Sequence, residues 1–139
     1  MCINKQKDGL PPTKSAGNLG ERAATRYLLL RGYRILERNW FYYKKEVDII
    51  ARRFGKLVFC EVKTRTVPQN AIGLLHAPAE AVNAEKRRNL LTAARAYRNL
   101  SGIFLPIRMD IIEVYLIKDE KSGKSKILRL NHIKNAFSP

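Results

Sequence analysis

The chain has 139 residues, a length that suits one domain whose hydrophobic core needs no disulfide or structural metal. Its 27 Lys and Arg residues outnumber its 12 Asp and Glu residues, which leaves a net charge of +15 at pH 7 and favours a polyanionic partner. We expect that partner to be nucleic acid rather than a membrane. No apolar run approaches the roughly 20 residues of a membrane span, and the basic residues do not gather on one amphipathic helix.

The N-terminal residues are polar and include several Gly and Pro residues, so we predict a flexible leader over residues 1–16 and a single domain over residues 17–139. This start lacks the apolar stretch of a signal peptide. The two cysteines, Cys2 and Cys60, form neither a disulfide framework nor a zinc-binding pattern. Together these features predict a protein of the reducing cytoplasm.

Apolar residues with helical spacing predict two helices, and short alternating or continuous apolar runs predict five strands. Gly32 is a good stop for the first helix, and Phe54–Gly55 suits a tight turn between the second and third strands. A long loop with two prolines is expected over residues 66–81. The expected helices and strands cover, in chain order, residues 18–32, 33–40, 45–53, 56–65, 82–100, 107–117 and 126–130. This order, α-β-β-β-α-β-β, predicts an α/β or α+β sheet with helices packed on it.

Charged residues end the third predicted strand, although its first residues are apolar enough for the core. Glu61 and Lys63 are two positions apart and so share a face of that strand. Glu46 and Asp48 share a face of the preceding strand for the same reason. If the two strands pair about the Phe54–Gly55 turn, these ends come together. The sequence therefore predicts two or three carboxylates close together in a strongly basic chain.

Clustered carboxylates repel one another and raise each other's pKa, and a divalent cation reverses this effect. Mg²⁺ prefers carboxylate oxygens, waters and substrate phosphates, and a lysine beside such a site can stabilise an attacking water. Glu21, near the apolar face of the first helix, can join the site. It can instead cap that helix by reaching back to the backbone of Asn18. Glu61 and Lys63 can instead form a surface ion pair, and the other carboxylates can line a solvated face.

Glu21, Asp48, the triplet Glu61-Val62-Lys63 and Lys86 form an ordered set that resembles the PD-(D/E)XK nuclease superfamily, and more closely the YraN-like family within it. The resemblance spans roughly residues 17–115. The matching stretches are GNLGERAA (17–24), GYRILERN (32–39), EVDIIA (46–51), LVFCEVKTR (57–65), the helix around Lys86, and RMDII (108–112). It implies a restriction-endonuclease-like mixed β-sheet flanked by helices, similar to that of the archaeal Holliday-junction resolvases.

The resemblance also implies roles for individual residues. In that superfamily the residues that match Asp48 and Glu61 hold the metal, and the backbone carbonyl that matches Val62 often adds a ligand. The residue that matches Lys63 serves the attacking water, and one that matches Glu21 often assists the metal shell.

Two positions depart from the family pattern without removing a ligand. Lys45 stands where relatives usually have Gly and can add a phosphate contact, and Met109 stands where they usually have Phe. Basic residues near the predicted site are expected to contact the nucleic-acid backbone. These are Lys45, Arg65, Lys86, Arg87 and Arg88, of which Lys86 can equally be a solvated residue.

We therefore expect a Mg²⁺- or Mn²⁺-dependent deoxyribonuclease, with branched or structured DNA as its substrate by analogy. The alternatives are a non-catalytic nucleic-acid-binding module that keeps the nuclease fold and a small scaffold protein with an RNA or acidic partner. A homodimer would suit a symmetric branched substrate, although no interface pattern in the sequence predicts one.

Three further features receive mainly structural interpretations. Asp110 is expected to be either a satisfied buried carboxylate, which we favour, or an outer part of the site. His76 and His132 are too isolated to indicate a metal ligand. The aromatic run Trp40–Tyr43 is expected to pack partly in the core, with stacking on unpaired bases as the alternative.

Overall fold

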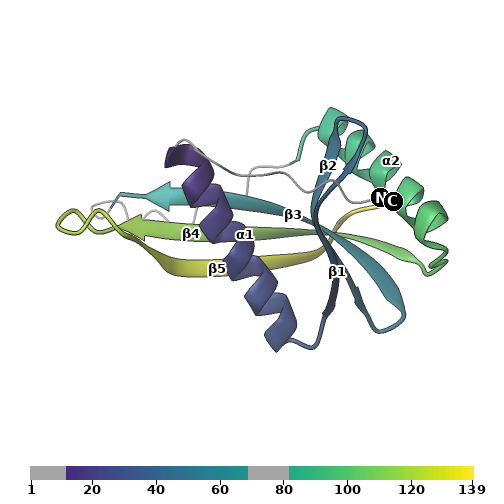
Figure 1. The fold of residues 1–139 in the computed structure, drawn as a ribbon, viewed down its shortest axis with the longest axis horizontal. Coiled ribbons are helices and arrows are strands. Elements are labelled where there is room, and N and C mark those ends of the chain that lie inside the picture. Colours follow the sequence, from purple (N-terminus) through teal and green to yellow (C-terminus); the bar gives the residue numbers. More distant parts are fainter. Residues whose placement is uncertain (1–11, 69–81) are drawn as a thin grey trace.

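The computed structural model describes residues 12–68 and 82–139, with side chains described from Ala16 onward. Within these residues the helices and strands follow the predicted order (Figure 1). Most of the predicted leader and of the 66–81 loop lies outside them. None of the described helices is long and apolar enough to cross a membrane. The bounds are α1 Pro12–Leu30, β1 Arg34–Tyr42, β2 Lys45–Arg53, β3 Lys56–Val67, α2 Ala84–Ser101, β4 Ile107–Lys118 and β5 Ser125–Phe137.

The strands form one open, mixed sheet in the order β1-β2-β3-β4-β5. Neighbouring strands are antiparallel except β3 and β4, which are parallel. A parallel pair needs a crossover connection, and here the crossover carries α2. Figure 1 shows α1 lying across β3, β4 and β5, with α2 beside the β1–β2 hairpin. The mixed sheet with flanking helices confirms the α/β class, and the likeness to restriction endonucleases stays a prediction.

The apolar run at the start of β3 exists because both faces of the sheet are covered there. Leu57 and Phe59 pack with residues of α2, in what we call the α2-side core. Val58 and Cys60 pack with residues of α1, in the α1-side core. A strand buried on both faces has a continuous apolar sequence rather than an alternating one.

The end of α1 confirms the predicted stop at Gly32. This glycine has a φ of +85°, which a residue without a Cβ adopts readily. Its amide donates to the carbonyl of Leu29 at 3.1 Å, and the amide of Tyr33 donates to the carbonyl of Leu28 at 3.0 Å. These two hydrogen bonds form a Schellman motif, which closes the helix and directs the chain into β1.

The start of α1 differs from the prediction. The helix begins at Pro12 rather than at residue 18, so it takes in the last residues of the predicted leader. Proline is well tolerated at the first helical position, because an amide there would have no partner inside the helix. Asn18 and Glu21 therefore lie within the helix instead of in its first turn, and the alternative in which Glu21 caps the start of the helix is wrong.

The turn between β2 and β3 confirms the predicted hairpin. Arg53 pairs with Lys56, and the two residues between them, Phe54 and Gly55, have φ values of +50° and +68°. Positive φ at both central residues is what a type I′ turn requires, and this turn suits the right-handed twist of the flanking strands.

β5 is much longer than the predicted strand at residues 126–130. The polar residues of its second half find partners on β4. The side-chain amide of Asn131 donates to Oε1 of Glu113 at 3.0 Å, and Nε2 of His132 lies 2.7 Å from Oδ2 of Asp110. The sequence pattern ended this strand at residue 130, because polar residues do not predict a strand when their partners lie on a strand that is distant in the sequence.

Candidate metal centre

The candidate site forms where β2 separates from β3. Backbone pairing between these strands ends at Ile49 and Cys60, and the amide of Val62 donates instead to Oδ2 of Asp48 at 2.8 Å. β2 also bends here, since Val47 packs in the α2-side core and Ile49 in the α1-side core. Residues two apart in a regular strand share a face. Asp48 therefore satisfies a backbone donor at the point where the sheet opens.

Three carboxylates meet at this opening. Glu21 of α1 and Glu46 and Asp48 of β2 each offer an oxygen atom within 4.8 Å of the other two, and all three residues are half-buried. We call these residues the acidic cluster, and they could hold a metal ion. The structure thus brings together two predicted site residues, Glu21 and Asp48. Glu46 completes the set, as one of the two or three carboxylates that the strand pattern predicted to meet, although it was not among the predicted metal ligands.

Gly20 lets α1 approach the sheet closely enough for Glu21 to reach the other two acids of the cluster. The glycine is buried, and a Cβ atom added to it would lie 2.9 Å from Cβ of Thr64 on β3. Real Cβ atoms essentially never come so close, so a residue with a side chain would push the helix away. Because Glu21 is the next residue, this contact holds its carboxylate near the opening between β2 and β3.

The acidic cluster is electrostatically unfavourable when its members are ionised. Burial raises the pKa of Asp48 well above its usual value, and the negative charge of Glu61 raises it further, as do those of the other cluster members. The hydrogen bond from the amide of Val62 opposes this rise. A divalent cation would remove the repulsion, and carboxylate oxygens are the donors that Mg²⁺ and Mn²⁺ prefer.

Glu61 adjoins the acidic cluster and is paired with a lysine. Burial raises the pKa of Glu61, and the positive charge of Lys86 lowers it in part, since Nζ of Lys86 lies 3.6 Å from Oε1 of Glu61. The other oxygen, Oε2, is buried and receives no hydrogen bond from the nitrogen and hydroxyl groups of the described residues. Asn83 caps α2 by accepting a hydrogen bond from the amide of Lys86 at 2.8 Å, which fixes the first turn of the helix.

Lys63 lies two residues beyond Glu61 on the same face of β3. Its positive charge also lowers the pKa of Glu61, after the larger contribution of Lys86. Its partner across the parallel β3–β4 pairing is Glu113, which is 2 % exposed. The side chain of Val62 packs toward the α1-side core, and the role of its carbonyl as a metal ligand stays a prediction.

Four of the predicted phosphate-contacting residues lie on β2, β3 and α2. Lys45 begins β2 and directly precedes the first cluster residue of that strand. Lys86 adjoins the cluster through its ion pair with Glu61. Arg65 lies further along β3, and Arg88 is exposed on α2. Their contacts with nucleic acid stay predictions.

Arg87, the fifth of these residues, is engaged within the fold. Its Nε donates to the carbonyl of Val82 at 2.9 Å, and its guanidinium carbon lies 5.4 Å from the centre of the Phe137 ring. These contacts join the start of α2 to the end of β5. Arg87 therefore has a structural role in addition to the predicted phosphate contact.

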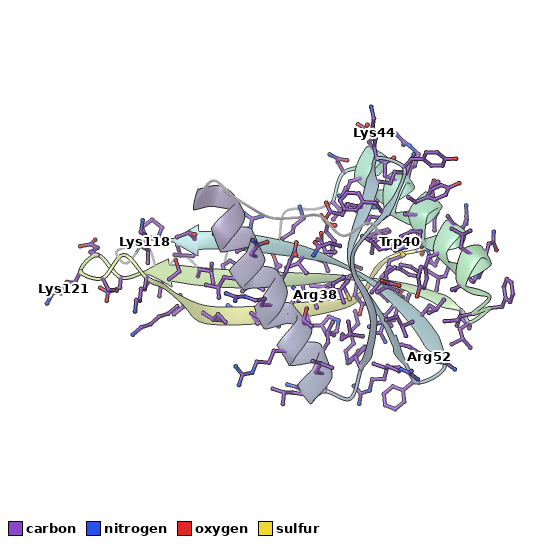
Figure 2. All side chains as sticks on the ribbon, in the orientation of Figure 1. Arg38, Trp40, Lys44, Arg52, Lys118 and Lys121 are labelled. Atoms are coloured by element: carbon purple, nitrogen blue, oxygen red, sulfur yellow. The ribbon has the colours of Figure 1, made fainter. Side chains whose placement is uncertain are left out.

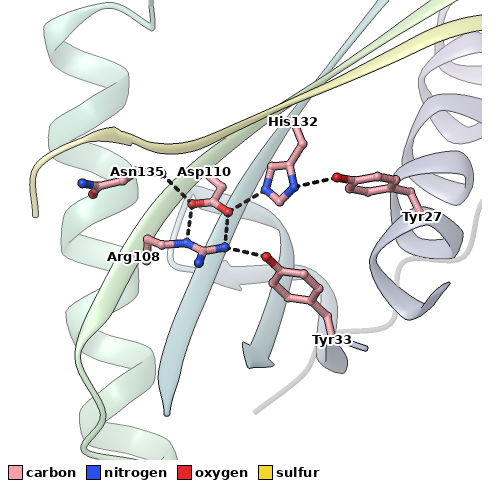
Figure 3. A network of polar contacts seen from close by, with 6 residues as sticks. All are labelled: Tyr27, Tyr33, Arg108, Asp110, His132 and Asn135. Atoms are coloured by element: carbon pink, nitrogen blue, oxygen red, sulfur yellow. Dashed lines mark hydrogen bonds and ion pairs between the residues drawn. The ribbon is translucent and has the colours of Figure 1, made fainter. Parts of the chain in front are cut away.

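A second polar constellation, centred on Asp110, lies between β4, β5 and α1 (Figure 3). The carboxylate of Asp110 accepts two hydrogen bonds from the guanidinium of Arg108, at 2.7 and 2.9 Å, and one from the amide of Asn135 at 3.0 Å. Nε2 of His132 lies 2.7 Å from the same carboxylate. The side chain of Asp110 is 0 % exposed, so four close contacts from three residues satisfy a fully buried acid.

This network gives Asp110 the structural role that was the favoured interpretation of its apolar strand. Burial raises its pKa, but hydrogen bonds from His132 and Arg108 outweigh burial and lower it overall. The hydroxyl of Tyr27 in α1 lies 3.2 Å from Nδ1 of His132, and Arg108 donates to the hydroxyl of Tyr33 at 2.7 Å. The sequence offered one clue, because Arg108 and Asp110 share a strand face, but His132 lies 22 positions away.

Comparison with known proteins identifies relatives over most of the chain. The sequence profile described as "Uncharacterised protein family UPF0102" matches residues 20–114, which include the whole acidic cluster. A UPF0102 protein of Porphyromonas gingivalis is 42 % identical over 121 residues, or 87 % of this chain and 82 % of that protein. A UPF0102 protein of Clostridioides difficile is 38 % identical over 127 residues, or 89 % of this chain and 97 % of that protein.

Proposed function

The chain belongs to the uncharacterised protein family UPF0102, and we propose that it is a Mg²⁺- or Mn²⁺-dependent deoxyribonuclease that hydrolyses phosphodiester bonds. The family's description carries no activity, so the support comes from the site. The observation that carries the proposal is the acidic cluster, three half-buried carboxylates with oxygens within 4.8 Å of one another in a chain of net charge +15. The resemblance to the PD-(D/E)XK nucleases favours the same reaction.

The residues at the opening between β2 and β3 fit a divalent cation. The three cluster carboxylates would hold it, and Glu61 and the carbonyl of Val62 are the further ligands that the family resemblance implies. The Oε2 atom of Glu61 is buried and receives no hydrogen bond from the described nitrogen and hydroxyl groups, so its lone pairs are available to bind a metal ion. When bound, the cation supplies a Lewis acid that polarises the phosphoryl group and lowers the pKa of water.

The protein's own groups position the carboxylates and supply positive charge. The amide of Val62 fixes the orientation of Asp48, and Lys86 offsets the charge of Glu61. Lys63 projects on the same face as Glu61, where an ammonium group can orient the attacking water and counter the charge that develops on the phosphate. We assign Lys63 that role.

The charge of the whole chain supports a nucleic-acid substrate. A net charge of +15 raises the local concentration of polyanions, and each neutralised phosphate releases condensed counterions. Branched DNA as the preferred shape and a homodimer on a symmetric junction belong to the same proposal, by analogy with the resolvases. The proposal also includes the cytoplasmic setting that the cysteine content and the polar N-terminal residues predict.

Cleavage of labelled DNA tests the proposal directly. Duplex, single-stranded, flap and four-way DNA would each be incubated with Mg²⁺, Mn²⁺ or EDTA. We expect metal-dependent cleavage by the wild type and a loss on the order of 100-fold in Lys63→Ala, as is typical when one preorganised electrostatic group is removed from a transition state.

Lys56→Ala is the matched control for this experiment. Lys56 is an exposed lysine at the other end of the same strand, away from the acidic cluster, so its removal should leave cleavage unchanged. If Lys63→Ala and Asp48→Asn both cut as well as the wild type, the activity does not arise at this site and the proposal fails.

A nucleic-acid-binding module without catalysis is the second candidate. The 3.6 Å ion pair between Lys86 and Glu61 favours it, because a lysine gives one acid of the site a countercharge without any cation. Tight DNA binding that persists in EDTA, together with no cleavage in any divalent ion, would support this candidate over the nuclease.

A further inference from the structure

A column of aromatic rings runs from the core to the tip of the β1–β2 hairpin. Trp40 is buried and packs edge-on against Tyr97 of α2, with ring centroids 5.2 Å apart. Tyr42 stacks nearly parallel to Trp40, at 6.3 Å and an interplanar angle of 9°. Tyr43 meets Tyr42 edge-on at 4.7 Å. The core therefore anchors this column and supports its outermost ring, that of Tyr43.

The folding of the hairpin does not explain an aromatic residue at position 43. The side chain of Tyr43 is 81 % exposed, so it buries little apolar surface. Its φ is +55°, a backbone conformation that a bulky residue rarely adopts and that Gly or Asn adopts readily in tight turns. Strained positions of this kind often serve a function.

The same hairpin tip carries positive charge beside the acidic cluster. Lys44, which is exposed, and Lys45 follow Tyr43, and Glu46 of the cluster comes next. Figure 2 shows Lys44 at the hairpin tip and Arg52 near the opposite end of β2. A strand rises about 3.3 Å per residue, so residue 43, in the turn before β2, lies at most roughly 10 Å along the chain from Glu46.

We propose that Tyr43 stacks on an unpaired base of the DNA strand whose backbone lies at the acidic cluster. Lys44 and Lys45 would contact the flanking phosphates. One strand advances about 3.4 Å per nucleotide when its bases are stacked, so the base would lie within roughly three nucleotides of the phosphate at the cluster. This inference rests on the proposed function and specifies its substrate as DNA with a single-stranded segment beside the bond that is cut.

Stacking on one exposed ring selects unpaired bases rather than a sequence. Every base has a π face, so base–aromatic stacking tolerates any sequence. A base inside a duplex already stacks on its neighbours and offers no free face to the ring. Tyr43 should therefore distinguish single-stranded from fully paired DNA.

Binding in EDTA, where the metal-dependent reaction cannot cut the strand, tests the inference. Fluorescence anisotropy would compare the wild type with Tyr43→Ala on a single-stranded oligonucleotide, a duplex with a single-stranded tail and a blunt duplex. We expect Tyr43→Ala to weaken binding to the first two by about tenfold, within the range for loss of one stacked base. Affinity for the blunt duplex should stay within about twofold, because no unpaired base is available there.

Phe54 provides a matched control at the other hairpin of β2. It is 80 % exposed and has a φ of +50°, but it lies at the end of β2 away from the acidic cluster. Phe54→Ala should leave all three affinities unchanged. Tyr43→Trp, which keeps a flat ring, should retain wild-type binding.

The outcomes separate this inference from the proposed nuclease activity. Unchanged binding by Tyr43→Ala, an equal loss on blunt and single-stranded DNA, or an equal loss in Phe54→Ala would each overturn the stacking role while wild-type cleavage stands. A change in self-association without a change in DNA affinity would identify the tip as an interface between copies and would also overturn it. A wild type that binds no DNA would overturn both proposals.

Discussion

Two carboxyl groups of the same sheet, the half-buried Asp48 and the buried Asp110, have pKa values that are shifted in opposite directions. Burial and the negative charges of Glu61, Glu21 and Glu46 raise the pKa of Asp48, and the hydrogen bond from one backbone amide does not compensate. Asp110 is buried as well, but its hydrogen bonds from His132 and Arg108 lower its pKa overall. The partners therefore decide the direction. The acid without enough positive neighbours is the one that a cation would stabilise.

The raised pKa of Asp48 predicts how stability depends on pH without metal. A carboxyl whose pKa is higher in the folded than in the unfolded chain keeps its proton longer when folded, so stability falls as pH rises from about 4 through the raised pKa. Asp48→Asn removes this pH-dependent loss of stability, because asparagine does not ionise, and its side-chain oxygen can still accept the hydrogen bond from the amide of Val62. In EDTA at neutral pH we expect a higher Tm for Asp48→Asn, by roughly 4 °C per kcal/mol relieved. Thermal melts from pH 4 to 8 measure this.

Adding metal should reverse the order of the two proteins. Mg²⁺ that binds only the folded state raises the Tm of the wild type by mass action, and Asp48→Asn should lose most of that response. Asp119→Asn is the control, because Asp119 lies in the β4–β5 turn away from the cluster and should keep the full response. A wild-type Tm that neither Mg²⁺ nor Mn²⁺ changes would contradict the cation site.

At the scale of the helices and strands, the contact between α1 and β3 sets the position of Glu21. Gly20→Ala would place a methyl group against the side chain of Thr64, and overpacking of this kind typically costs about 1–3 kcal/mol. We expect a lower Tm and a weaker Mg²⁺ response, because the helix must shift and take Glu21 with it. Melts with and without Mg²⁺ test both effects.

Gly17→Ala is the matched control within the same helix. A Cβ at Gly17 would meet nothing within 4 Å, so the substitution should be neutral or stabilising, since alanine favours a helix by up to about 1 kcal/mol over glycine. If Gly20→Ala is as stable as Gly17→Ala and responds equally to Mg²⁺, the close approach of α1 does not position the cluster.

At the scale of the whole molecule, the net charge of +15 should govern affinity through salt. In EDTA, the logarithm of the binding constant should fall linearly with the logarithm of salt concentration, by about 0.9 per phosphate contact on duplex and about 0.7 on single strands. Replacing the exposed Arg88 with Gln should reduce this slope if it contacts a phosphate. Tyr43→Ala should lower the affinity for single-stranded DNA and leave the salt slope unchanged. Binding that does not respond to salt would argue against a phosphate-tracking surface.

Much of the fold was predictable because neighbours in the chain determine it. Strand periodicity, the Phe54–Gly55 turn and the stop at Gly32 depend on residues close in sequence, and the structure confirms each of them. The two large errors concern the length of β5 and the start of α1. β5 continues past residue 130 because β4 satisfies its polar residues, and α1 starts early although its Gly and Pro residues resemble a leader.

The candidate site, like the fold, was predictable only in the part that depends on residues close in sequence. The sequence alone determined that acids of two paired strands, Asp48 and Glu61, meet in a strongly basic chain, since a two-residue turn leaves the hairpin little choice of register. Only the tertiary structure decided that Glu21 joins Glu46 and Asp48 while Glu61 pairs with Lys86. Those contacts depend on how α1 and α2 pack on the sheet. The lack of a side chain at Gly20 and the bend of β2 at Asp48 determine which carboxylates can meet.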